Sequence, residues 1–332
     1  MRDIRVGVAQ FEARDADKAW NLARIDQLAA RAASNGAEVV AFHECSVSGY
    51  TFLMTRRREE IVALAERVPG GPSVRELEAI ARRHDVVVAA GLVEEDAGRL
   101  FNTYAVVARD GMVAKFRKIH PFVSPHLSAG DEYVVFDLLG CRWGILICYD
   151  NNLPENVRIT ALRGAEIIFM PHVTCGLDSP MPGRGKIARE LWERREHDPV
   201  PLRLEFTGPK GRGWLLRWLP ARAYENGVYA LFTNMVGVDH DTIKPGCSMV
   251  LDPFGEIVVE STALGDDVVV AWLAADRVAL SSGRRYLRAR RPELYEELVA
   301  PPPPDRPPLT APGWRLERPD DGTATRDATT EA

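Results

Sequence analysis

Two kinds of hydrophobic pattern alternate along most of the chain. Short runs rich in β-branched residues predict strands, and stretches with apolar positions three or four residues apart predict helices over 16–34 and 73–84. Strands are expected at 4–11, 38–43, 86–93, 103–109, 133–138, 142–147, 167–171, 228–235, 249–259 and 268–273. This alternation favours a layered α/β fold, and turn signals at 109–111 and 253–255 indicate mixed sheets.

Two regions interrupt this pattern. Residues 174–219 are rich in Gly, Pro, Arg and Trp and are too long for an ordinary connection, so we expect an inserted helical excursion or lid. Residues 301–332 begin with a proline run, a composition typical of an extended or disordered tail. The predicted organisation is therefore one domain over 1–300, with an insertion at about 174–219, followed by the tail.

Composition and charge limit the classes of binding partner that the protein can have. The 332 residues are 46% hydrophobic and 27% charged, with 42 Lys plus Arg against 47 Asp plus Glu, a formal charge of −5. Without a basic surplus, nucleic acid and anionic membranes are poor candidates. The N-terminus lacks the apolar stretch of a secretory signal, and the five cysteines form no CxxC pair. We therefore expect a cytoplasmic protein with reduced cysteines.

Cys148 is the leading candidate for covalent chemistry. It follows the predicted strand 142–147 and precedes a helical pattern over 153–163, a junction that exposes a side chain above a sheet beside backbone N–H groups. A cysteine thiol is mostly protonated at neutral pH, so such a nucleophile needs a base or a positive neighbour. A small buried hydrophobe is the alternative interpretation of a single cysteine at a strand end.

Glu44 and Lys118 can supply those two groups. Glu44 follows the apolar strand 38–43, where poor solvation would raise the pKa of a carboxyl towards that of a general base. Lys118 ends a strand-like segment, and strand alternation directs it and Arg117 to opposite faces. Each residue also has a simpler interpretation when it is considered alone. Glu44 can be an ion-paired residue at the end of a strand, and Lys118 can be part of a solvated basic edge.

Together, these segments resemble the nitrilase superfamily, the carbon-nitrogen hydrolases. Glu44 in HECSVSGY, Lys118 in KFRKIHP and Cys148 in CYDNNLPE occur in the order of that family's Glu-Lys-Cys triad, within a similarity that runs from about residue 4 to 298. The resemblance implies a four-layer α-β-β-α sandwich with two mixed β-sheets, homodimers or larger homo-oligomers, and no metal or organic cofactor. It assigns Cys148 as nucleophile, Glu44 as general base and Lys118 as oxyanion stabiliser.

The resemblance also suggests supporting residues around this triad. For oxyanion or substrate positioning the candidates are Tyr149, through its backbone N–H, with His120, His126 and His172. For His120 and His126, a hydrogen-bonded structural role is the alternative interpretation. For structural support near the site they are Asp150, Glu155, Arg222, Glu225 and Asn226. Many family members carry a second glutamate shortly before a glycine that resembles Gly130. No carboxylate lies between Lys118 and Asp131, so Ser124, His126 or a residue from elsewhere is expected to take that role.

The substrate expected from the resemblance is a small amide or N-carbamoyl compound, because Tyr149-Asp150 after the cysteine is similar to the amidase and carbamoyl-hydrolase branches. Acyl transfer to an amine and a catalytically impaired binding subunit remain alternatives. In the insertion, Trp192, Trp214 and Trp218 are interpreted as packing residues. Its arginines, including Arg184, could meet a substrate carboxylate, but interleaved glutamates favour internal ion pairs.

Overall fold

Two six-stranded sheets form the body of the computed structural model, which describes residues 1–179 and 181–301. The first sheet has the order β14 (Asp267–Leu273), β1 (Ile4–Gln10), β2 (Val39–Ala41), β3 (Val87–Asp96), β4 (Arg99–Ala108) and β5 (Gly111–Arg117). The second has the order β13 (Ile257–Glu260), β12 (Met249–Leu251), β9 (Tyr229–Asn234), β8 (Ile167–His172), β7 (Cys141–Ile145) and β6 (Val135–Leu138).

Both sheets are mixed and share one plan, in which three parallel strands are flanked by antiparallel ones. In the first sheet β1, β2 and β3 are parallel, with Val6 opposite Val39 and Val39 opposite Val87. In the second sheet β7, β8 and β9 are parallel, with Trp143 opposite Ile167. Ligand and active sites of such sheets tend to gather at the carboxyl ends of the parallel strands, where several loops meet.

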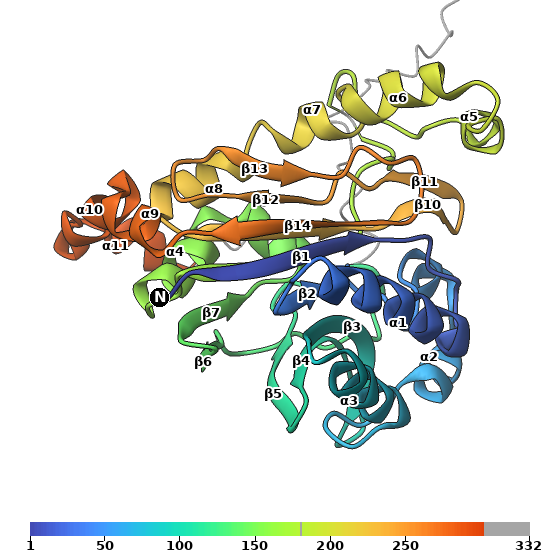
Figure 1. Ribbon diagram of the computed structural model, residues 1–332, viewed down its shortest axis with the longest axis horizontal. Helices are drawn as coiled ribbons and strands as arrows, with labels where there is room; N and C mark the ends of the chain where they lie inside the picture. The colour runs from blue at the N-terminus through green and yellow to red at the C-terminus, as the bar shows by residue number, and fades with distance from the viewer. Residues whose placement is uncertain (180, 302–332) are drawn as a thin grey trace, which may run out of the picture.

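Helices cover the outer faces. On the first sheet lie α1 (Lys18–Ser34) and α3 (Pro72–His84), which contact each other and the strands beneath them (Figure 1). On the second sheet lie α4 (Pro154–Leu162) and α8 (Leu219–Asn226). Helix α1 is capped by Asp17, whose carboxylate accepts a hydrogen bond from the backbone N–H of Trp20 and so satisfies one free donor of the first turn.

The core is divided by these layers. One cluster joins the facing sides of the two sheets and includes Val6, Val39, Trp143 and Phe169, all fully buried. A second cluster lies between the first sheet and α1 and α3. Because apolar side chains fill the space between sheets as well as beneath the helices, the architecture is the predicted α-β-β-α sandwich.

Shorter helices complete the chain. They are η1 (Thr51–Thr55), α2 (Arg58–Leu64), η2 (Cys148–Asn152), α9 (Ala275–Leu280), α10 (Ser282–Arg288), η3 (Pro292–Leu294) and α11 (Glu296–Val299). None of the helices within the described part of the chain is long and apolar enough to cross a membrane.

The segment 174–219, which we expect to be an insertion, contains three helices among its described residues and rests on a hairpin that the pattern did not reveal. It holds α5 (Arg189–Glu193), α6 (Pro199–Thr207) and α7 (Arg212–Leu215), drawn as a row beyond β13 in Figure 1. Beneath it, β10 (Val236–Asp239) pairs with β11 (Thr242–Pro245). A third apolar cluster, which includes Trp192, Phe206 and Ile243, binds insertion and hairpin together.

Two further sequence predictions have different outcomes. The run at 249–259 forms two strands, β12 and β13, because the turn at 253–255 folds it back on itself. The tail predicted to be extended or disordered at 301–332 lies outside the described residues, except for residue 301.

Candidate active site

Glu44 lies three residues beyond the end of β2, in a fully buried position. Its Oε1 accepts hydrogen bonds from the Lys118 ammonium at 2.6 Å and the Asn102 amide at 2.7 Å, and its Oε2 accepts one from the backbone N–H of Val173 at 3.1 Å. Buried carboxylates require such partners, because an isolated charge in the interior is strongly destabilising. The three donors fix the orientation of the carboxylate.

Lys118 directly follows β5 and is equally buried. Its ammonium also donates to the Tyr50 hydroxyl at 3.2 Å, and it lies 5.0 Å from the Phe122 ring centroid. Burial alone would lower the pKa of Lys118, but the negative charge of Glu44 leads the opposing effects that hold this pKa well above its ordinary value. The lysine is therefore a permanent cation beside Glu44.

Gly130 permits the loop after Lys118 to close against β5. Its N–H donates to the Lys118 carbonyl at 2.9 Å. A Cβ at this position would lie 2.2 Å from the Arg117 carbonyl oxygen, which no side chain can accommodate. A glycine is therefore required where the chain passes the base of the lysine.

Cys148 is the first residue of η2 and has a left-handed φ of +49°. Left-handed backbone is uncommon for residues other than glycine, and strained residues of this kind often occur at active sites. Burial and the adjacent Glu44 charge raise the pKa of the Cys148 thiol, while Lys118 acts in the opposite direction. The thiol is consequently protonated at neutral pH, beside a carboxylate that can accept its proton.

Asp150 and Arg222 hold the turn that carries Cys148. The Asp150 carboxylate accepts hydrogen bonds from the backbone N–H groups of Ile119 and His120, at 3.2 and 2.9 Å, and so joins this turn to the segment after Lys118. The Arg222 guanidinium donates to the carbonyls of Asn151 and Asn152, at 3.0 and 2.8 Å. Both residues thus have positions suited to the structural support expected from the sequence.

A cavity of about 420 Å³ opens at Cys148. Tyr149 and Asn152 line it beside the cysteine, and Val173 and Thr174 line it from the segment after β8. Its remaining lining residues are Tyr50, Thr51, Met54, Phe122, Val123, Leu177, Asp178, Ser179, Met181, Arg184 and Trp214. The cavity is thus bounded partly by residues of the segment 174–219.

The predicted histidines have different surroundings. The His120 ring is 2.8 Å from Asp150 Oδ1, and its centroid is 6.2 Å from that of Tyr149, so it borders the site. His172 is fully buried, with its Nε2 3.2 Å from the Asn151 amide, and burial followed by Lys118 lowers its pKa well below the ordinary value. His126 does not line the cavity.

The remaining predicted residues lie around α4 and α8. Asn226 donates to the Arg222 carbonyl at 2.9 Å, and Glu225 is 3.4 Å from the Arg222 guanidinium, so both support the arginine that clasps the turn. Glu155 is exposed in the first turn of α4, where a carboxylate interacts favourably with the helix dipole.

Nothing in the described residues between Lys118 and Gly130 substitutes for a second carboxylate. The Ser124 hydroxyl accepts a hydrogen bond from the His126 backbone N–H at 3.3 Å, whereas the lysine ammonium donates to Glu44 and Tyr50. The groups beside the ammonium are instead Tyr50 and Phe122. Tyr50, which belongs to the segment that carries Glu44, thus supplies the hydroxyl that contacts the lysine.

Sequence reasoning missed several groups at the site. Tyr50 ends the HECSVSGY segment, so its proximity to Glu44 along the chain was a usable signal. No sequence signal pointed to Asn102 or to the Val173 backbone, since only the pairing of distant strands brings them to Glu44. Arg184 lines the cavity, and no carboxylate among the described residues lies within ion-pair distance of it, contrary to the expected internal pairing.

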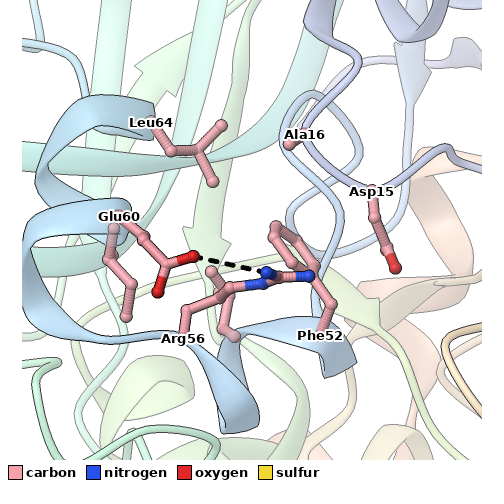
Figure 2. Close-up of a pocket in the computed structure, with 8 residues that line it drawn as sticks. Asp15, Ala16, Phe52, Arg56, Glu60 and Leu64 are labelled. Atoms are coloured by element: carbon pink, nitrogen blue, oxygen red, sulfur yellow. Dashed lines mark hydrogen bonds and ion pairs between the residues drawn. The ribbon is translucent and has the colours of Figure 1, made fainter.

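A second hollow, of about 250 Å³, has a different character. It lies beside η1 and α2 and is lined by Asp15, Phe52, Arg56, Glu60 and neighbouring residues. Figure 2 shows Arg56 directed at Glu60, 3.3 Å away, so its cation is already paired. No cysteine lines this hollow. Across residues 1–179 and 181–301, no group of three His, Cys, Asp or Glu side chains has an arrangement able to hold a metal ion.

Comparisons with known proteins identify relatives of this chain and agree with its fold. The Carbon-nitrogen hydrolase family model matches residues 5–281. An (R)-stereoselective amidase from Pseudomonas sp is 31% identical, covering 89% of this chain and 94% of that protein. A citrullinase from Francisella tularensis is 28% identical, covering 90% of this chain and 99% of that protein.

Solved structures share the architecture as well. An amidase of the nitrilase superfamily from Nesterenkonia AN1 aligns with a TM-score of 0.66 at 23% identity, covering 89% of this chain and 97% of that one. The family match spans most of the chain, and the Pseudomonas amidase is similar over nearly the whole of it. The chain therefore belongs to the carbon-nitrogen hydrolase family.

Proposed function

We propose that the protein is a thiol-dependent amidase that cleaves the C–N bond of a small amide through an acyl-enzyme on Cys148. The observation that carries the proposal is the meeting of a buried carboxylate and a buried ammonium, 2.6 Å apart, with a thiol that lines a cavity. The pKa of that thiol is raised, so it needs the base that Glu44 provides.

In the first half of the reaction, Glu44 takes the proton from Cys148 as the sulfur attacks the amide carbonyl carbon. The carbonyl oxygen becomes an oxyanion, which the Lys118 ammonium and the Tyr149 backbone N–H stabilise. Collapse of this intermediate breaks the C–N bond, and Glu44 returns its proton to the departing ammonia or amine. A thioester remains on Cys148.

In the second half, Glu44 removes a proton from water as the water oxygen attacks the thioester carbon. The resulting oxyanion meets the same two donors. Collapse breaks the C–S bond, releases the carboxylic acid and returns the proton to the sulfur. One carboxylate can serve both halves because each begins with a proton to remove and ends with a proton to return.

The (R)-stereoselective amidase and the citrullinase among the relatives support an amide or a carbamoyl group as the substrate. In the Nesterenkonia amidase, a Glu-to-Gln variant shows covalent addition of the acetamide moiety of fluoroacetamide at the active site cysteine. That precedent supports Cys148 as the corresponding nucleophile here. A small amide is the first choice because it needs only the groups already described.

Intact-mass measurement after exposure to fluoroacetamide, together with ammonia release from simple amides, tests the proposal. Wild-type protein should release ammonia and Glu44→Gln should retain an adduct on Cys148. Cys148→Ala should lose activity by on the order of 10⁴-fold or more, because the covalent route is removed. Cys45→Ala is the matched control, since that thiol is also buried beside Glu44 but does not line the cavity. Wild-type rates in Cys148→Ala would overturn the proposal.

Product analysis in the presence of an added amine separates hydrolysis from acyl transfer. Hydrolysis yields the acid alone, whereas acyl transfer yields a new amide. The impaired-subunit alternative instead predicts stoichiometric acylation without turnover.

A further inference from the structure

The Tyr50 hydroxyl is a polar group beside the Cys148 cavity to which the proposed chemistry assigns no role. Tyr50 lines that cavity, although the residue as a whole is only 4% exposed. Its oxygen accepts a hydrogen bond from the Lys118 ammonium at 3.2 Å. An ammonium has no lone pair, so this contact occupies one lone pair of the phenol oxygen and leaves the phenol proton available to another acceptor.

No protein acceptor for that proton is present in the described part of the chain, residues 1–179 and 181–301. A buried hydroxyl donor normally has a partner, because burial without one forfeits the hydrogen bond that it made in water. Burial raises the pKa of Tyr50 well above its ordinary value, and the charge of Glu44 acts in the same direction. The phenol therefore keeps its proton at neutral pH, and the cavity is where an acceptor can enter.

The side chains of Lys118 and Tyr50 can contact the same oxygen atom of a substrate. Their donor atoms, the ammonium nitrogen and the phenol oxygen, are 3.2 Å apart. An oxyanion donor acts from about 2.7–3.1 Å. A point at such a distance from both atoms exists, because the two distances together exceed the separation of the donors. The oxyanion expected beside Lys118 is therefore within reach of the phenol as well.

The position of Tyr50 is fixed by the turn that joins it to Glu44. The backbone N–H groups of Ser48 and Gly49 donate to the Cys45 carbonyl at 3.1 and 2.8 Å. Gly49 has a left-handed φ of +81°, which suits glycine, and Tyr50 follows it directly. A donor that is held in place before the substrate binds stabilises developing charge without a cost of reorientation.

We propose that Tyr50 is a further catalytic residue, whose hydroxyl donates a hydrogen bond to the substrate oxygen on which negative charge develops. It joins the Lys118 ammonium and the Tyr149 backbone N–H as a third oxyanion donor in both halves of the reaction. The phenol proton stays on Tyr50 throughout, so no bond to this residue forms or breaks. This inference rests on the proposed amidase function and adds a side chain from the segment that carries the base.

The test compares two reactions of the same sulfur atom. Acylation of Cys148 by 4-nitrophenyl acetate passes through an oxyanion, whereas alkylation by iodoacetamide displaces iodide and forms none. Release of 4-nitrophenolate measures the first rate, and mass spectrometry of the Cys148 peptide measures the second. Tyr50→Phe should slow acylation roughly 10- to 100-fold, the range for losing a hydrogen bond to a charged group, and should leave alkylation nearly unchanged.

Tyr104→Phe is the matched control. Tyr104 is also buried, and its hydroxyl donates to the carbonyls of Phe42 and Ala89 at 2.7 and 2.9 Å, but it does not line the cavity. This variant loses a buried phenol hydroxyl from the same sheet layer without removing a donor from the cavity. Its melting temperature should fall, while its acylation and alkylation rates should match those of wild type.

A double-mutant cycle separates a direct contact with the substrate from an effect transmitted through Lys118. If the hydroxyl acted only by holding the lysine, Tyr50→Phe would change nothing once the ammonium is absent. Direct donation predicts instead that adding Tyr50→Phe to Lys118→Met slows acylation by roughly a further 10-fold. The activated ester keeps these slow reactions measurable.

Three results would overturn the inference while leaving the amidase function standing. The first is unchanged acylation in Tyr50→Phe, and the second is an equal loss of acylation and alkylation, which would show that Tyr50 supports the site as a whole. The third is no further loss in the double variant, which would assign Tyr50 to positioning the lysine. Failure of the ester to acylate Cys148 in wild type, together with no ammonia release from simple amides, would contradict the amidase function itself.

Discussion

Within residues 1–179 and 181–301, two lysine–carboxylate pairs are fully buried, and their surroundings differ. In one, Lys118 lies 2.6 Å from Glu44, and in the other, Lys244 lies 3.5 Å from Asp239, with all four side chains fully inaccessible to solvent. The first pair adjoins a thiol and a cavity. The second pair is surrounded by other segments of the protein. Asp239 accepts hydrogen bonds from the Thr51 backbone N–H and hydroxyl, and Lys244 donates to the Cys175 carbonyl.

The difference shows that burial of an ion pair does not identify a catalytic centre. Both pairs join a lysine to a carboxylate and are equally excluded from water, yet only Glu44 and Lys118 lie beside a thiol that lines a cavity. The Lys244–Asp239 pair instead connects the β10–β11 hairpin to η1 and to the start of the insertion, two walls of the cavity. Its expected role is to keep those walls in place.

Lys244→Met should produce the largest effect on stability. It leaves the Asp239 carboxylate buried without its cation, a change that typically costs about 3–5 kcal/mol of the free energy of unfolding. Because the pair supports cavity walls and not the reacting atoms, KM should rise while kcat of the folded protein changes little. Urea denaturation and steady-state kinetics on a simple amide measure both quantities. A collapse of kcat with unchanged stability would reverse the roles assigned to the two pairs.

Lys118→Met should have a much larger effect on the chemical step than Lys244→Met. Removing one oxyanion donor costs about 2.7–4 kcal/mol of transition-state stabilisation, which corresponds to a fall in kcat of roughly 10²- to 10³-fold. Glu44 retains its hydrogen bonds from Asn102 and Val173, so the folded state should remain accessible. Single-turnover rates measured well below the melting temperature separate the loss of catalytic rate from the loss of stability. Lys244→Met serves as the comparison.

The pH dependence of Cys148 alkylation distinguishes the two pairs, because only a change in the first pair should shift the pKa of the thiol. After burial, the charge of Glu44 is the largest influence that raises the pKa of this thiol, so Glu44→Gln should lower that pKa. The iodoacetamide reaction of the Cys148 peptide, followed by mass spectrometry, should then shift to lower pH than in wild type. Lys244→Met should leave the profile where it is. A shift of the Glu44→Gln profile to higher pH would contradict the assigned contact.

The smallest expected effects come from two neighbouring residues, one beside each pair. Tyr50→Phe removes the hydroxyl that accepts a hydrogen bond from Lys118, and Thr51→Val removes the hydroxyl that donates to Asp239. A single hydrogen bond to a charged group contributes about 1.5–3 kcal/mol. Tyr50→Phe should therefore lower kcat by about 10- to 100-fold, and Thr51→Val should lower only the melting temperature. A loss of 10³-fold in Tyr50→Phe would instead assign the phenol to proton transfer.

Much of this arrangement could be predicted from residue order alone. Apolar periodicity located most strands and the two long helices, because each buries one face against a layer. The Glu44, Lys118 and Cys148 segments were identified because each adjoins a strand and carries a specific motif. The β10–β11 hairpin escaped prediction, since strands of four residues give too few alternating positions to stand out.

Arg184 illustrates why the rest could not be predicted. The expected internal ion pairs assumed a helix, in which charges three or four residues apart become neighbours. The chain is not helical at 184–188, and α5 begins only at Arg189, where the pair with Glu193 does form. Likewise, the partners of Glu44 come from β4 and from the segment after β8, a meeting that depends on how the two sheets are stacked.

That stacking has a consequence for how the enzyme can be tuned. Glu44 extends from the first sheet and Cys148 from the second, and the Thr233 hydroxyl of β9 reaches across to the Phe42 carbonyl at 2.9 Å, beside the base. The distance between the Cys148 sulfur and the Glu44 carboxylate is therefore set by how the two sheets pack against each other. Surface loops can change which molecules enter, while substitutions between the sheets would alter the rate for every substrate at once.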